Sequence, residues 1–246
     1  MKILIAFFMC VNLCYAATIT MTTIEPSELG KCRKDFAVKL CKKYSDLYTC
    51  VKFRKNKQQY VTWAEIFSED SRRNEIQRIN RRDTLVWINH CIAIPVNGTI
   101  SPLPLSQLDN RYQEKTIVID LKQLAWGAYQ YGKLINWGLA NGGIGRCKET
   151  GLVQCKTPVG IWKILKKDGA VIKSSLYPVE CKDKKVCGHT MFWRLKFKLD
   201  GSSLHGDKNL PGANISHGCV RLPKQDAKFI NTKFAELGTT VVVLPY

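Results

Sequence analysis

Cysteine is the residue that most constrains how this chain can fold, because eleven cysteines occur in 246 residues. In an exported protein such a content indicates disulfides, whereas in a cytosolic protein it indicates metal binding or catalysis. The interpretation of the cysteines therefore depends on the cellular compartment, and a targeting signal at the start of the chain would indicate that compartment.

The first sixteen residues have the pattern of a secretory signal. Lys2 gives a positive start, an apolar run covers residues 3–11, and small residues precede a cleavage point after Ala16. The apolar run is far shorter than the roughly 20 residues that a membrane-spanning helix needs. We expect a signal peptide at 1–16 and no transmembrane segment after its removal. Nine cysteines would then remain, and an odd number leaves at least one thiol unpaired.

The chain is strongly basic, with a formal net charge of +18 at pH 7, of which the signal would remove only the charge of Lys2. A charge of this size attracts polyanions. The basic residues are scattered along the sequence, and an exported protein seldom meets nucleic acid, so we expect no nucleic-acid partner and favour anionic polymers of the cell envelope. Part of the charge belongs to the solvated faces of strands and helices.

Residues 47–96 have the pattern of a small α+β module. The predicted elements are a strand at 48–53, a helix beginning at the Thr62-x-x-Glu65 capping box, a helix at 74–80 and a strand at 91–95. This order resembles the lysin motif, a small glycan-binding module, although Tyr60-Val61 stands where that motif has Gly-Asp. Glycan binding and a purely structural role as a spacer both remain open for it.

The rest of the chain divides into a lead-in, a linker and a larger domain. Residues 17–46 have little periodicity and predict an irregular or partly helical lead-in, and residues 97–114 hold turn residues typical of an extended linker. Within 115–246, β-branched and alternating stretches such as 193–199 predict strands, with one helix over 227–237. The sequence therefore predicts a mainly β domain with a basic outer face.

Two short motifs in this domain carry reactive side chains, Leu204-His205-Gly206 and Ser216-His217-Gly218-Cys219. A nucleophilic cysteine needs a base within reach and donors for the oxyanion that forms after attack, and histidine is the suitable base near neutral pH. Spacing alone leaves open a zinc site built from His189, His205, His217 and Cys219. No paired Cys-x-x-Cys accompanies these residues.

The arrangement as a whole resembles the active-site signature of the L,D-transpeptidase catalytic domain. Cys219 follows His205 by fourteen residues, and Arg221 lies two residues beyond the cysteine. The segments 157–160 and 141–143 add weaker similarities. The resemblance covers 115–246 and implies a β-sandwich with short helices that needs no metal or organic cofactor.

The resemblance also implies a role for each matching residue. Cys219 would be the nucleophile, His205 the general base and acid, and the Gly206 carbonyl the group that orients the imidazole. The supporting positions are Ser216 and His217 beside the thiol, Gly218 in the oxyanion hole, and Arg221 as a structural or substrate-carboxylate contact.

The implied function is that of a peptidoglycan L,D-transpeptidase, an acyltransferase of the periplasm or cell envelope of a bacterium. The Cys219 thiolate would form a thioester with the third residue of a tetrapeptide stem, release D-alanine, and pass the acyl group to an amine. The acceptor stays open between a second stem, a protein lysine, a D-amino acid and water, the last giving an L,D-carboxypeptidase. The alternatives of other classes are a non-catalytic envelope-binding protein and a secreted thiol oxidoreductase, and the second is disfavoured by the lack of Cys-x-x-Cys.

With Cys219 as the nucleophile, eight cysteines remain and predict four disulfides. The pairing is chosen by proximity along the chain or on neighbouring strands. The predicted pairs are Cys147–Cys155, Cys181–Cys187, Cys50–Cys91 and Cys32–Cys41.

Overall fold

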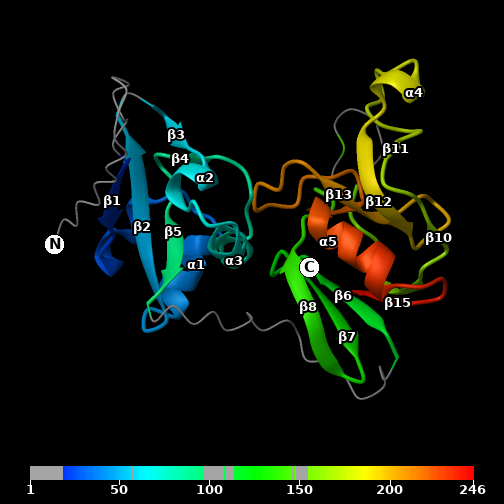
Figure 1. Cartoon of the computed structure of the whole chain (residues 1–246), viewed down its shortest axis with the longest axis horizontal. Helices are drawn as coiled ribbons and strands as arrows, with labels where there is room; N and C mark the ends of the chain where they lie inside the picture. Colours follow the sequence, from blue (N-terminus) through cyan, green and yellow to red (C-terminus); the bar gives the residue numbers. More distant parts are fainter. Residues whose placement is uncertain (1–18, 57, 97–107, 109–113, 146, 148–154) are drawn as a thin grey trace. The chain divides into compact units, whose positions relative to one another are not determined.

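The computed structural model describes residues 19–56, 58–96, 108, 114–145, 147 and 155–246 (Figure 1). The chain forms two compact units, Met1–Ser101 and Pro102–Tyr246, and the division falls within the segment predicted as a linker. The predicted signal peptide at 1–16 and most of that linker lie outside the described residues. Within the described ranges, no helix combines the length and apolar character needed to cross a bilayer.

The N-terminal unit is built on a three-stranded antiparallel sheet with the order β1-β2-β5. Its strands are β1 (Ile19–Thr23), β2 (Tyr48–Lys55) and β5 (Ile92–Pro95). The segment predicted as a lead-in supplies β1, the 3-10 helix η1 (Pro26–Lys31) and helix α1 (Phe36–Lys43). These elements escape the sequence pattern because they are short, and because β1 is an edge strand with mostly exposed side chains.

Two helices and a small hairpin complete this unit. They are β3 (Tyr60–Val61), α2 (Trp63–Ile66), α3 (Asp70–Asn80) and β4 (Val86–Trp87). The predicted capping box is confirmed, since the Glu65 N–H donates to Thr62 Oγ1 and the Thr62 N–H donates to Glu65 Oε2. Helix α3 begins four residues before the predicted start, because its first turn is charged and lies outside the apolar repeat of Ile76 and Ile79.

The predicted disulfides of the N-terminal unit are wrong in their pairing. The structure joins Cys32 to Cys91 and Cys41 to Cys50, in place of Cys50–Cys91 and Cys32–Cys41. The register of β2 and β5 sets Cys50 opposite Ala93 and not opposite Cys91. The Cys50 side chain instead meets helix α1, which carries Cys41.

The described residues of the C-terminal unit form two five-stranded sheets. The first has the order β8-β7-β6-β15-β9, with β6 (Thr116–Asp120), β7 (Ala125–Gln130), β8 (Lys133–Leu139), β9 (Gly160–Lys163) and β15 (Thr240–Val243). The second has the order β10-β12-β13-β14 with β11 beside β12, and comprises β10 (Lys166–Lys167), β11 (Ile172–Lys173), β12 (Thr190–Lys196), β13 (Ser203–Asp207) and β14 (Val220–Pro223). The helices are α4 (Lys184–Cys187), α5 (Lys224–Phe229) and the π-helical turn η2 (Ile230–Phe234).

One core of buried residues joins both sheets and helix α5. Ile119 and Trp126 enter it from the first sheet, Leu204 and Val220 from the second, and Ala227 from α5. Each large apolar side chain buried in this way contributes about 1.5–3 kcal/mol relative to exposure. The predicted mainly β fold, with a sandwich and short helices, is therefore confirmed: over both units the described residues are 36% strand and 22% helix.

The last helix is shorter than predicted. It ends at Phe234, and Ala235 is already extended, so Leu237 lies outside the helix with 67% of its surface exposed. Ala227, Ile230 and Phe234 do face the core as the helical spacing predicts. The error arises because a fourth apolar residue continued the spacing past the end of the helix.

Candidate active site

The predicted catalytic residues lie on β13 and at the start of β14, which pair in parallel. Leu204 is opposite Val220, and His205 is opposite Arg221. Cys219, one residue before β14, is therefore level with Ser203, which lies two residues before His205. Side chains alternate between the two faces of a strand. His205, Cys219 and Arg221 therefore share one face, while Leu204 and Val220 enter the core.

A shaped turn precedes Cys219. Gly218 has φ +118°, a left-handed conformation that glycine adopts without strain. The Ser216 hydroxyl braces the turn, because Ser216 Oγ accepts a hydrogen bond from the Gly218 N–H at 3.1 Å and donates to the Cys219 carbonyl. The Ser-x-Gly-Cys sequence thus fixes the backbone that carries the thiol.

The Asn-Gly-Gly segment at 141–143 runs beside this turn. Asn141 and Arg221 exchange two backbone hydrogen bonds of 2.9 and 2.8 Å. A Cβ on Gly143 would lie 1.9 Å from the Cys155 carbonyl oxygen, so only glycine fits there. The weak sequence similarity at 141–143 is therefore a packing requirement of the site.

Two cavities reach Cys219, with volumes of about 510 and 210 Å³. The larger one has a charged lining that includes Lys156, Arg194, Lys198 and Asp200. The smaller one is lined by the three side chains His189, His205 and Arg221 among others. Both cavities are bordered by Ser174, Tyr177, Met191, His217 and Cys219.

The predicted nucleophile and base share the smaller cavity but are not hydrogen-bonded to each other. Cys219 Sγ lies 4.0 Å from the Gly201 carbonyl oxygen, and among the contacts of the described residues there is none between this sulfur and His205. Cys219 is half-buried and is the free cysteine of the described part of the chain. A proton transfer between the two would require the thiol to turn from Gly201 toward the imidazole.

The His205 imidazole is oriented as the resemblance implies. Its Nδ1 donates to the Gly206 carbonyl oxygen at 3.0 Å, which leaves Nε2 as the unprotonated nitrogen. Burial lowers the pKa of His205 to about 4, although the hydrogen bond to Gly206 and the charge of Asp207 act in the opposite direction. The ring is therefore neutral at pH 7 and can accept a proton.

The Cys219 thiol is also neutral at rest. Burial raises its pKa above the ordinary value, while the Ser203 N–H and the charges of Arg221 and Arg194 partly oppose this. A neutral thiol beside a neutral imidazole becomes a thiolate only when the base removes its proton. The resting site is accordingly a pair of neutral groups and not a thiolate–imidazolium ion pair.

A carboxylate that sequence analysis missed holds two of the site residues. Asp207 Oδ2 lies 3.0 Å from His189 Nε2 and 3.3 Å from Arg221 Nε. The strand pattern could have identified it, since Asp207 follows His205 by two residues and must share its face. In the described part of the chain, no group of three or more His, Cys, Asp or Glu side chains is placed to hold a metal, so the zinc alternative finds no ligand set there.

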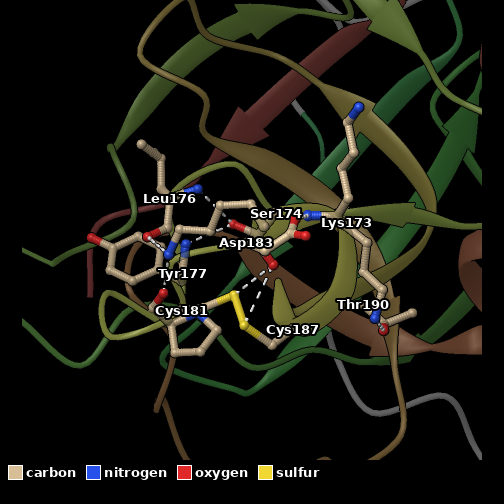
Figure 2. Close-up of a disulfide and its surroundings, with 11 residues drawn as sticks. Lys173, Ser174, Leu176, Tyr177, Cys181, Asp183, Cys187 and Thr190 are labelled. Carbon is tan, nitrogen blue, oxygen red and sulfur yellow. Dashed lines mark hydrogen bonds between the residues drawn. A yellow bond between two sulfur atoms is a disulfide. The ribbon is translucent and has the colours of Figure 1, made fainter.

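A disulfide-closed arm, defined as residues 174–189 between β11 and β12, borders both cavities. Figure 2 shows the Cys181–Cys187 disulfide beside Leu176 and Tyr177. The Tyr177 N–H donates to Ser174 Oγ at 2.9 Å. The Tyr177 ring stacks on His217, with centroids 4.3 Å apart. No sequence pattern indicates Tyr177 as a site residue, because only the folded arm brings it to the site.

The predicted disulfides of the C-terminal unit are confirmed. Cys147 pairs with Cys155 and Cys181 pairs with Cys187, across eight and six residues of sequence. Cys155 lies on the wall of the larger cavity, so this bond fixes one border of the site.

A half-buried cysteine and a buried, neutral histidine on neighbouring strands are the parts that cysteine acyltransferases use. The L,D-transpeptidase catalytic domain, known as YkuD, matches residues 114–243, which is more than half of the chain. The protein belongs to this family, and the match lies within the segment predicted as a single larger domain, 115–246, except for residue 114.

Solved L,D-transpeptidase structures are similar to part of the chain at low identity. The L,D-transpeptidase of Xylanimonas cellulosilytica is 22% identical over 58% of this chain and 64% of that one, with a TM-score of 0.47. The enzyme of Stackebrandtia nassauensis is 24% identical over 54% and 56%, with a TM-score of 0.42. L,D-transpeptidase 1 of Mycobacterium tuberculosis is 17% identical over 54% and 62%, with a TM-score of 0.40. The chain thus spans less than two thirds of each of these structures, and no curated protein sequence matches it.

Proposed function

We propose that this protein is an exported peptidoglycan L,D-transpeptidase in which Cys219 is the nucleophile and His205 the general base and acid. The main support for this proposal is the parallel pairing of β13 with β14, because it brings the side chains of Cys219 and His205 to one face of the sheet and both residues line the smaller cavity. The hydrogen bond from His205 Nδ1 to Gly206 adds the orientation that a base needs. Family membership supplies the reaction class.

The first half of the reaction forms a thioester. The Cys219 thiol turns toward His205 Nε2 and gives up its proton as the sulfur attacks the carbonyl carbon of the third stem residue. The Gly218 N–H is already bonded to Ser216, so the Cys219 N–H is the donor we assign to the oxyanion. The C–N bond then breaks, His205 returns the proton to the departing D-alanine nitrogen, and the acyl group remains on sulfur.

The second half transfers the acyl group. An amine attacks the thioester carbonyl, His205 accepts the proton that this nitrogen loses, and the C–S bond breaks to regenerate the thiol. The larger cavity offers the acceptor a separate approach to Cys219, and its lysine and arginine side chains suit a stem peptide that carries carboxylates. When water is the acceptor, the same steps give an L,D-carboxypeptidase.

The test is incubation of the purified protein with tetrapeptide-containing muropeptides, followed by mass spectrometry. We expect release of D-alanine and formation of 3-3 cross-linked dimers, and loss of both in Cys219→Ala at unchanged thermal stability. D-alanine release by Cys219→Ala would show that another group is the nucleophile. Tripeptide monomers without dimers would identify a carboxypeptidase, and binding without any release would identify a non-catalytic envelope protein.

We further propose that the N-terminal unit binds glycan strands, in line with its resemblance to the lysin motif. The supporting observation is an aromatic pair, Tyr60 on β3 and Trp87 on β4, with ring centroids 5.5 Å apart and exposures of 40% and 44%. Exposed aromatic faces are platforms for the apolar faces of sugar rings. Trp87→Ala should weaken retention of the full-length protein on purified peptidoglycan without changing its fold.

Anionic envelope polymers are the second partner that we propose, on the basis of the net charge of +18. Attraction between exposed charges is screened beyond about 8 Å at physiological ionic strength. Retention through charge should therefore fall steeply as salt rises, whereas retention through the Tyr60–Trp87 pair should not. A comparison of wild type and Trp87→Ala across a salt series therefore separates the two partners. Full retention of Trp87→Ala at high salt would contradict glycan binding through this pair, and the N-terminal unit would then be a structural spacer.

A further inference from the structure

The carboxylate of Asp207 contacts residues on both sides of β13, His189 and Arg221. Asp207 ends β13, is only 8% exposed, and shares the face of His205 two residues earlier. Its Oδ2 meets His189 Nε2 at 3.0 Å from the segment before β12, and Arg221 Nε at 3.3 Å from β14. Its Oδ1 accepts the Lys208 N–H at 2.6 Å. The carboxylate therefore links β13 to β14 and to the residue that precedes β12.

The two groups that Asp207 holds also flank the imidazole of His205. The His189 and His205 rings meet edge to face with centroids 5.9 Å apart, and Arg221 stands opposite His205 in the register of β13 and β14. The Gly206 carbonyl restrains the ring only at Nδ1. His205 also lines the smaller cavity together with His189 and Arg221.

The charge of Asp207 matters as much as its contacts. When His205 takes the proton of Cys219, the imidazole becomes a cation in a buried place where Arg221 already carries a positive charge. A buried cation without a nearby negative charge is costly. Asp207 is the carboxylate that faces His205, and the other charged or titratable groups around that ring are His189 and Arg221.

We propose that Asp207 is a positioning residue of the transpeptidase site, which holds His189 and Arg221 against His205 and stabilises the imidazolium formed during proton transfer. This inference rests on the proposed function. The state of the carboxylate agrees with it: burial raises the pKa of Asp207, but the hydrogen bond with His189 and the charge of Arg221 outweigh this and keep the group ionised.

The experiment compares Asp207→Asn with wild type in D-alanine release across a pH series, and follows the His205 ring by NMR titration. Asparagine keeps the size and removes the charge. We expect kcat to fall by about tenfold to a hundredfold with KM within twofold. This loss is smaller than most of the roughly 10²- to 10⁴-fold effect of a direct general acid–base group, because Asp207 acts through His205. Since Asp207 raises the pKa of His205, its loss should move the acidic limb of the rate profile, and the NMR titration of His205, to lower pH.

Two further variants make the outcome decisive. Asp207→Glu keeps the charge and should keep the acidic limb at its wild-type pH even where kcat falls, and it also serves if Asp207→Asn does not fold. Glu236→Gln removes an equal charge from an exposed pair with Lys115, and should leave rate and profile unchanged. An Asp207→Asn enzyme with wild-type kcat and acidic limb would overturn the inference alone. A wild-type protein that releases no D-alanine would overturn the proposed function, and the inference with it.

Discussion

Gly138 packs against the hydrogen bond that ties helix α5 to the first sheet. Near the end of β8, its Cα faces the contact in which Trp126 Nε1 of β7 donates to Asp226 Oδ2 of α5 at 3.0 Å. Both partners are at most 2% exposed. A Cβ added at position 138 would lie 2.0 Å from Asp226 Oδ2 and 2.5 Å from Trp126 Nε1. Gly138→Ala must therefore displace one or both partners.

Two costs add in this substitution. Loss of a buried hydrogen bond to a charged acceptor costs about 1.5–3 kcal/mol, and overpacking of a filled core costs about 1–3 kcal/mol. We expect the free energy of unfolding to fall by about 4 kcal/mol in total, less than the sum of the two upper values because local relaxation relieves part of the overpacking. At about 2–4 °C per kcal/mol for a domain of this size, the Tm of the C-terminal unit should fall by roughly 10 °C.

Differential scanning calorimetry of the full-length protein measures this effect. Gly169→Ala is the matched control, because a Cβ there meets no atom within 4 Å. The transition of the N-terminal unit should be unaffected in both variants. If Gly138→Ala melted within 2 °C of Gly169→Ala, the Trp126–Asp226 contact would not be what fills the space beside Gly138.

His205 has a pKa of about 4 when folded, below the ordinary 6.5, so its contribution to stability is fully present above pH 6.5 and is lost as the pH falls toward 4. This loss should amount to about 3 kcal/mol in urea unfolding, and His205→Asn should lack it. Because burial raises the pKa of Cys219, its alkylation by iodoacetamide should be slow at pH 7 and accelerate through pH 9, whereas a fast plateau near pH 7 would indicate a resting ion pair. Replacing both Cys181 and Cys187 by Ser should destabilise the arm by about 2 kcal/mol and reduce D-alanine release several-fold, and unchanged turnover would show that the arm does not position Tyr177.

The two motifs identified His205 and Cys219 as candidate reactive residues but did not place them on strands. The face shared by His205 and Cys219 follows from the period of two in β13 and β14, and the same rule would have placed Asp207 beside them. The turn at Gly218 also follows from local chemistry, because a residue with positive φ is best served by glycine.

Long-range register and packing could not be predicted in this way. The pairing of Cys50 depends on the register of β2 relative to β5 and on the position of α1. Neither of these produces a periodic pattern in the sequence. Tyr177 reaches His217 only through the folded arm. His189 contacts Asp207, which is close to it in the folded structure but distant from it in the sequence.

Cys219 follows every bonded cysteine of the described chain in the sequence. The two bonds of the N-terminal unit use cysteines up to Cys91, and the next two join neighbours only eight and six residues apart. Each of the four bonds therefore closes a loop that lies wholly N-terminal to residue 219. The proposed nucleophile and the disulfide framework can thus be separated by mutation, because Cys219→Ala leaves each of these eight cysteines with its partner.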